Sequence, residues 1–193
     1  MKRTGRIMTL RGTKPITTQG TGTAGGESYE IFSYKSPDQS RGWKIVNAYC
    51  WMDMYSNLGG GDSQLGLQAC LTTDVIAANV TGSQASQRAY LKQYAPGDNR
   101  TVAWNFQAYL TRDDTSNDFL NMDGGMLGDQ TKFLHDRERI INRELYLNAI
   151  ANTEAVGSIL TNINYYIELE EIVLSDIESI MSSVKSIAQN ITD

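Results

Sequence analysis

The last third of the chain, residues 139–190, most narrows what the protein can fold into, because the spacing of its apolar residues changes there. Apolar and polar residues alternate over 145–149 and again over 164–170, the pattern of strands with one buried face. From Ser175 onward, apolar residues recur every three or four positions, which is typical of an amphipathic helix. Two strands and a helix in succession require a sheet for the strands to join and a surface for the helix to cover.

The start of this helix has a recognisable signal. In Ser175-Asp-Ile-Glu178 the serine hydroxyl can accept from a free backbone N–H while the glutamate reaches back, which is the capping-box arrangement. We therefore predict a C-terminal amphipathic helix over residues 175–193. Its apolar stripe is expected to pack on the chain's own sheet or on a neighbouring subunit, and consists of Ile177, Ile180, Met181, Val184, Ile187 and Ile191.

Further strands are predicted at 27–35, 43–55, 65–72 and 100–110, separated by turns rich in Gly, Ser, Asn and Asp. In the second of these, Trp43, Ile45, Asn47, Tyr49 and Trp51 are expected to share one face. In the last, Val102, Trp104 and Phe106 alternate with Ala103, Asn105 and Gln107. Residues 73–93, 113–130 and 151–161 are predicted as mainly loops. These elements favour an all-β protein, an antiparallel β-sandwich over residues 27–174, with the jelly roll preferred.

Residues 1–26 are rich in Gly and Thr and lack apolar periodicity, so we predict a flexible N-terminal arm. The arm has a charge of +5 and no acidic residue, whereas the remaining 12 basic and 22 acidic residues give the rest of the chain −10. A basic arm on an acidic body indicates contact with nucleic acid or with an acidic neighbouring subunit, although short basic termini can also be inert. The residues expected to make this contact are Lys2, Arg3, Arg6, Arg11 and Lys14.

The sequence offers no catalytic, cofactor or metal motif. His135 is the one histidine, and with two distant cysteines it makes no zinc set. Cys50 and Cys70 lie in apolar runs and are predicted to be buried free thiols. Glu168, Glu170 and Glu171 are interpreted as a solvent-facing charged face rather than as catalytic carboxylates. The three tryptophans are expected to pack in the core or between subunits. We therefore predict a protein that is not an enzyme.

No apolar run has the length of a membrane-spanning helix, and no secretory signal is visible. The chain is therefore expected to be made in the cytoplasm, and to stay there or to leave as part of an assembly.

Taken together, the chain resembles the single jelly-roll structural proteins of small viruses and tailless phages. The resemblance is carried by the basic Gly- and Thr-rich arm from Lys2 to Gly26, the strand-rich body with long loops, and the closing block. That block is Asn164-Tyr-Tyr-Ile-Glu-Leu-Glu-Glu171 followed by the Ser175-Asp-Ile-Glu178 helix start, and it also looks like the closing block of short proteins from marine viral sequences.

This resemblance implies a bacteriophage capsid protein that assembles with copies of itself, and with other capsid proteins, into the shell of the virion after synthesis in the host cytoplasm. The body would tile the shell, and the arm would touch the genome or lace neighbouring subunits together. Five positive charges are few beside strongly basic packaging tails, so both arm roles stay open. The alternatives are another phage virion component, such as a tail or spike module, and a carbohydrate-binding β-sandwich with an exposed coplanar aromatic pair.

Overall fold

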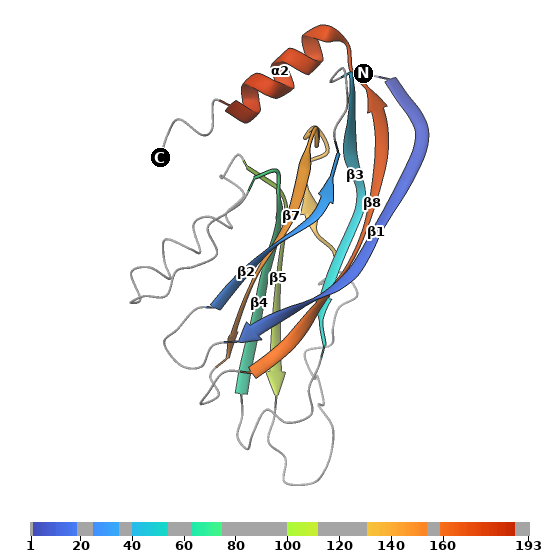
Figure 1. Cartoon of the computed structure of the whole chain (residues 1–193). Helices are drawn as coiled ribbons and strands as arrows, with labels where there is room; N and C mark the ends of the chain where they lie inside the picture. The colour runs from blue at the N-terminus through green and yellow to red at the C-terminus, as the bar shows by residue number, and fades with distance from the viewer. Residues whose placement is uncertain are drawn as a thin grey trace.

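The computed structural model describes residues 2–18, 25–34, 40–53, 63–74, 100–111, 131–153 and 159–187, and within them the chain forms two antiparallel sheets followed by a helix (Figure 1). The three-stranded sheet has the order β1 (Lys2–Thr18), β8 (Ile159–Val173) and β3 (Arg41–Met52). The five-stranded sheet has the order β2 (Gly25–Ser33), β7 (Glu144–Thr153), β4 (Ser63–Thr72), β5 (Thr101–Thr111) and β6 (Leu134–His135). The helix, α2, spans Asp176–Ile187.

The segment around β6 also lies along β3 and supplies the three-stranded sheet with a fourth member. Trp43 exchanges backbone hydrogen bonds of 2.9 and 2.8 Å with Ile141. Further along, Cys50 N donates to the Thr131 carbonyl and Phe133 N donates to the Ala48 carbonyl, both at 2.8 Å. The order β1-β8-β3-β6 segment facing β2-β7-β4-β5 is that of a jelly roll, in which two Greek keys are wrapped together. The predicted all-β jelly roll with a C-terminal helix is therefore confirmed.

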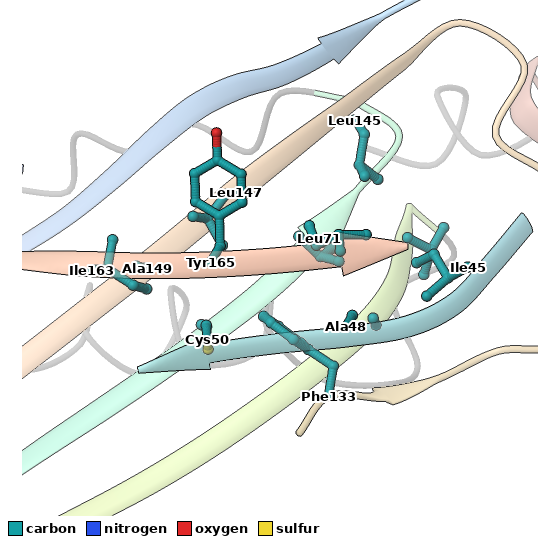
Figure 2. Close-up of a cluster of buried hydrophobic side chains, with 14 of the residues drawn as sticks. Ile45, Ala48, Cys50, Leu71, Phe133, Leu145, Leu147, Ala149, Ile163 and Tyr165 are labelled. Carbon is teal, nitrogen blue, oxygen red and sulfur yellow. The ribbon is translucent and has the colours of Figure 1, made fainter. Parts of the chain in front are cut away.

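The core lies between the two sheets (Figure 2). Alternate residues of β8 and β7 point into it, as period-two strands require. The fully buried side chains from these two strands are Leu145, Leu147, Ala149, Ile163, Ile167 and Leu169. Phe133, from the segment that joins the sheets, is 1% exposed and closes the core at the β3 side.

The predicted faces of β3 are only half correct. Trp43 and Ile45 are buried, but the pairing of β3 with β8 shifts register between Ile45 and Asn47. Such a bulge moves the inward face by one residue. Beyond it, the residues buried in the core are Ala48, Cys50 and Met52, and not Asn47, Tyr49 and Trp51.

The prediction of a flexible arm is wrong for residues 2–18, which form a strand of the three-stranded sheet. β1 pairs with β8 from Lys2↔Val173 to Thr18↔Ile159, and β2 already begins at Gly25. The physical reason is that β8 needs hydrogen-bond partners on both of its edges. Ile16 of β1 is 1% exposed, and Met8 and Leu10 pack against the core.

Gly12 is a position of β1 at which a neighbouring strand leaves no room for a larger residue. A Cβ atom at Gly12 would lie 2.7 Å from the Tyr165 hydroxyl oxygen and 2.9 Å from the ring carbon that carries it. The Tyr165 ring of the neighbouring strand therefore occupies the space that any larger residue at position 12 would need.

The predicted loop at 151–161 is shorter than expected, because β7 continues to Thr153 and β8 begins at Ile159. The predicted loop at 113–130, and most of that at 73–93, lie outside the described residues.

Candidate functional site

The capping box predicted at the start of α2 is present. Glu178 N donates to Ser175 Oγ at 3.4 Å, and Ser175 N donates to Glu178 Oε2 at 3.0 Å. Just before it, Leu174 is 4% exposed and its N–H donates to the Ser40 carbonyl at 2.7 Å. The helix is thus held at its first turn and is tied to the chain that leads into β3.

The apolar stripe of α2 faces water. Ile177, Ile180 and Met181 are 72%, 63% and 56% exposed, which is far more than large apolar side chains in a packed core. Figure 1 shows α2 beyond the end of the sandwich at which β8 finishes, rather than along a sheet face. Val184 and Ile187 belong to α2, but their side chains, and Ile191, lie outside what is described. At its N-terminal half, the stripe is not covered by the chain's own sheets.

A second exposed apolar surface lies on β5, at residues that the alternation of this strand did not identify as a surface. Alternation alone would place Trp104 and Phe106 in the core, yet Phe106 is 68% exposed while Asn105 and Gln107 are buried. The amides face inward because they satisfy buried carbonyls of the opposite sheet. Gln107 Nε2 donates to the Cys50 carbonyl at 2.8 Å, and Asn105 Nδ2 donates to the Lys132 carbonyl at 2.9 Å.

Two of the basic residues of β1 are engaged with carboxylates. Arg3 Nε lies 3.5 Å from Glu170 Oε2, and Arg6 Nη1 lies 3.8 Å from Glu171 Oε1. A bulge in β1 sets this spacing, since the register with β8 shifts between Arg3 and Ile7 and Gly5 takes a φ of +76°.

Glu171 is the polar centre of this end of the three-stranded sheet. Its side chain is 3% exposed and lies between Arg6 of β1 and Arg41 of β3. Thr4 Oγ1 also donates to Glu171 Oε2 at 3.2 Å. The prediction that Glu171 faces solvent is therefore wrong, and β8 is the central strand of its sheet rather than an edge.

The other basic residues of β1 lie apart from this cluster. Arg11 is opposite Tyr166 on the outer face of the sheet, and Lys2 is at the strand's beginning, opposite Val173. Lys14 Nζ lies 5.5 Å from the centroid of the Tyr29 ring, across the corner between the two sheets. The five predicted contact residues are thus spread along one strand and do not gather into a single basic patch.

The outer face of the three-stranded sheet carries polar side chains that bind one another. Asn47 Nδ2 donates to Glu168 at 2.6 Å and Tyr166 donates to its other oxygen at 2.9 Å. The hydrogen bond from Asn47, and then that from Tyr166, lower the pKa of Glu168. Tyr49 and Tyr166 meet at 6.3 Å with an interplanar angle of 51°, so they do not form a coplanar pair.

His135 lies on β6 and is half-buried. Burial is the main cause that lowers its pKa, the nearby Arg137 and Lys132 lower it further, and the Phe133 carbonyl and Asp136 act in the opposite direction.

Both cysteines are buried and free, as predicted. Within the described part of the chain, no group of three His, Cys, Asp or Glu side chains could hold a metal ion. No helix in that part is long and apolar enough to cross a membrane.

No family model and no curated protein matches the chain. Among solved structures, it is similar to Merkel cell polyomavirus VP1 in complex with GD1a oligosaccharide, at 8% identity and a TM-score of 0.42, over 91% of this chain and 98% of that one. It is also similar to the decameric BFDV capsid protein, at 15% identity and a TM-score of 0.39, over 86% of this chain and 100% of that one. A tobacco necrosis virus structure matches at 12% identity and a TM-score of 0.33, over 91% of this chain and 100% of that one.

The resemblance to viral jelly-roll proteins that the sequence indicated is thus found among solved structures as well. Because all three TM-scores are below 0.5, the assignment of the fold rests on the strand topology described above.

Proposed function

We propose that the chain is a structural subunit of a viral shell, which assembles with further copies of itself and resides in the virion. The observation that carries the proposal is the exposed stripe Ile177, Ile180 and Met181 on a firmly capped helix. Burying one such side chain fully is worth about 1.5–3 kcal/mol. Association that covers the stripe therefore has a substantial driving force.

A jelly roll can host many functions, so the features of the body that support this role are specific ones. Two long strands, β1 and β8, run side by side for most of their length and give the three-stranded sheet a rigid frame. α2 projects from the end of that frame (Figure 1). Near the same end, the side chain of Glu171 joins the three strands. A stiff body with a projecting apolar helix is suited to repeated contacts between identical copies.

The finer parts of the proposal come from the sequence. A bacteriophage origin is implied by the resemblance to structural proteins of small viruses and tailless phages, and synthesis in the host cytoplasm stays an expectation. Contact with the genome or a neighbouring subunit falls to Lys2, Arg3, Arg6, Arg11 and Lys14, now as side chains of β1. Of these, Arg11 lies on the outer face, away from the Glu171 cluster, and is the best placed for such contact.

Light scattering coupled to size-exclusion chromatography, followed by negative-stain microscopy, tests the proposal. We expect concentration-dependent oligomers that mature into closed shells. A ring or trimer would instead favour a tail or spike module. A monomer that binds glycans would favour the carbohydrate-binding alternative, and a strict monomer at high concentration would count against assembly altogether.

A matched pair of variants then tests the helix. Ile180→Lys places a charge in the stripe, and Ile7→Lys places the same charge at a site of equal exposure on β1, 62% against 63%. Both positions are exposed, so both variants should fold with unchanged circular dichroism. We expect Ile180→Lys to stay monomeric and Ile7→Lys to assemble. Assembly of Ile180→Lys at the wild-type concentration would refute the role of the stripe.

A further inference from the structure

The surface on β5 and β6 is the second place where large apolar side chains face water. Phe106 and Leu134 are 68% and 67% exposed, and Trp104 is half-buried between them. Trp104 of β5 is paired with Leu134 of β6, and Phe106 lies two residues further along the same face of β5. We call Trp104, Phe106 and Leu134 the β5–β6 patch.

The patch is fixed on the outside of the sandwich by the polar residues that alternate with it. Asn105 and Gln107 are held inward by hydrogen bonds to the Lys132 and Cys50 carbonyls and by the 2.7 Å bond from Gln107 Nε2 to Asn105 Oδ1. Turning β5 over to hide Phe106 would break all three bonds and leave buried carbonyls without these donors. The patch must therefore be covered from outside or remain in water.

The charges around the two apolar surfaces differ in sign. Residues 132–139, on either side of Leu134, carry three basic side chains (Lys132, Arg137 and Arg139) and two acidic ones (Asp136 and Glu138), a net charge of +1, and Lys132 and Arg137 are exposed. The first turn of α2 carries Asp176 and Glu178, next to Ile177. An acidic helix end and a basic patch margin attract one another, and this attraction would set the orientation of a contact between them.

We propose that α2 of one copy docks on the β5–β6 patch of the next copy. Ile177, Ile180 and Met181 would lie against Phe106 and Leu134, with Asp176 towards Lys132 and Arg137. Donor and acceptor surfaces are different, so the contact is head-to-tail and can repeat around a ring or shell. This inference rests on the proposed function, since it names the surface that receives the helix during assembly.

Disulfide trapping between two kinds of subunit tests the contact. Tagged Ile180→Cys chains are mixed with untagged Leu134→Cys chains, assembled and oxidised, and the products are separated on a non-reducing gel. Both native cysteines are 0% exposed, so the new thiols are the ones that react. We expect a tagged–untagged dimer. Ile180→Cys mixed with Ile7→Cys is the control, because Ile7 is equally exposed on the other sheet, and it should give no such dimer.

The outcomes separate this inference from the proposed function. Shells that form without the tagged–untagged crosslink would overturn the inference and leave the shell subunit standing. Crosslinked homodimers of Ile180→Cys chains would show that the helix pairs with another helix. A third variant carries both Ile180→Cys and Leu134→Cys, and a crosslink within one such chain would show that the helix docks on its own body. Either result would overturn the inference. Absence of any oligomer would overturn both proposals.

A charge exchange provides a second test that does not depend on crosslinking. Asp176→Arg should raise the concentration needed for assembly several-fold, and adding Arg137→Asp should restore it towards the wild-type value. If Asp176→Arg raises the concentration needed for assembly by the same factor in the wild-type and Arg137→Asp backgrounds, the proposed orientation is contradicted.

Discussion

Arg41 Nη1 donates a hydrogen bond of 3.3 Å to Glu171 Oε1, and so joins β3 to β8 a few residues before α2 begins. The same carboxylate accepts from Thr4 and lies 3.8 Å from Arg6, so that one buried acid connects all three strands of the sheet. The end of β8 from which α2 projects is therefore held by a polar cluster in addition to the buried side chains of Ile172 and Leu174.

We expect Glu171→Gln to lower the free energy of unfolding by about 1–2 kcal/mol, because a buried carboxylate with two hydrogen-bond donors and a nearby second arginine is replaced by a neutral amide. The effect is limited because the two arginines are 69% and 50% exposed and are partly screened by water. Urea denaturation measures it. Glu170→Gln is the control, since its partner Arg3 is 81% exposed, and it should cost less than about 0.5 kcal/mol. Equal losses in the two variants would contradict the central role of Glu171.

The second prediction concerns β1, which is part of the sandwich and not a tail. Deleting residues 2–18 should abolish cooperative unfolding, because it removes the buried Ile16 and leaves one edge of β8 without its partner. Calorimetry of the truncated chain measures this. A stable truncated chain with a sharp transition would show that β1 is dispensable.

The charges of β1 should therefore be tested by substitution rather than by deletion. Replacing Arg11 and Lys2 with Gln keeps the strand and leaves the Glu171 cluster intact. If these side chains contact the genome, assembled particles should retain less nucleic acid, and retention should fall more steeply as salt is added to the wild type than to the variant. Unchanged nucleic-acid content and salt dependence would remove the genome role and leave contact between subunits.

The sequence revealed the fold better than the orientation of individual side chains. Alternation in β7 and β8, and the capping box at Ser175, depend on neighbouring residues alone, and these predictions are confirmed. Pairing of β1 with β8 depends on residues about 150 positions apart in sequence, which no local pattern in a Gly- and Thr-rich segment can show. For the same reason, the bulge after Ile45 could not be predicted.

The surfaces that matter for assembly were predictable only in part. The stripe on α2 follows from helical spacing, but whether it is covered depends on where the end of β8 directs the helix. The β5–β6 patch contradicts local polarity, because Asn105 and Gln107 are inside and Phe106 is outside. The two amides at alternate positions of this strand, Asn105 and Gln107, were a signal in the sequence, but the direction in which they point depends on carbonyls of residues distant in sequence.

A fourth prediction uses the close approach of Gly12 and Tyr165. Gly12→Ala should destabilise the fold by about 1–3 kcal/mol, because the new methyl group overlaps the Tyr165 ring and hydroxyl. Adding Tyr165→Phe removes the atom closest to that methyl group and should recover part of the loss. Thermal denaturation of the two single variants and the double variant gives the coupling between the sites. If the stability changes of the two single variants simply add in the double variant, the Tyr165 ring moves aside freely from the new methyl group.

The fifth prediction concerns the thiols. Burial raises the pKa of Cys50 well above its usual range, although a hydrogen bond from Gln107 opposes the shift. With Cys70 also fully buried, an aromatic disulfide reagent should label neither thiol in the native protein and both after unfolding. Ile180→Cys is the positive control, and its thiol should react at once. Rapid labelling of the wild type would show that the sandwich opens readily around β3 or β4.

The last prediction is a pH dependence of stability that arises from His135. Burial lowers the pKa of His135 in the folded chain, so below about pH 6.5 the unfolded chain gains a proton there that the folded chain resists. The free energy of unfolding should therefore fall as the pH drops through and below that value. His135→Gln should flatten this part of the profile. Urea midpoints of both proteins, measured between neutral and mildly acidic pH in the Ile180→Lys background to prevent assembly, give the comparison. Parallel profiles for the two proteins would show that His135 titrates alike in the folded and unfolded states.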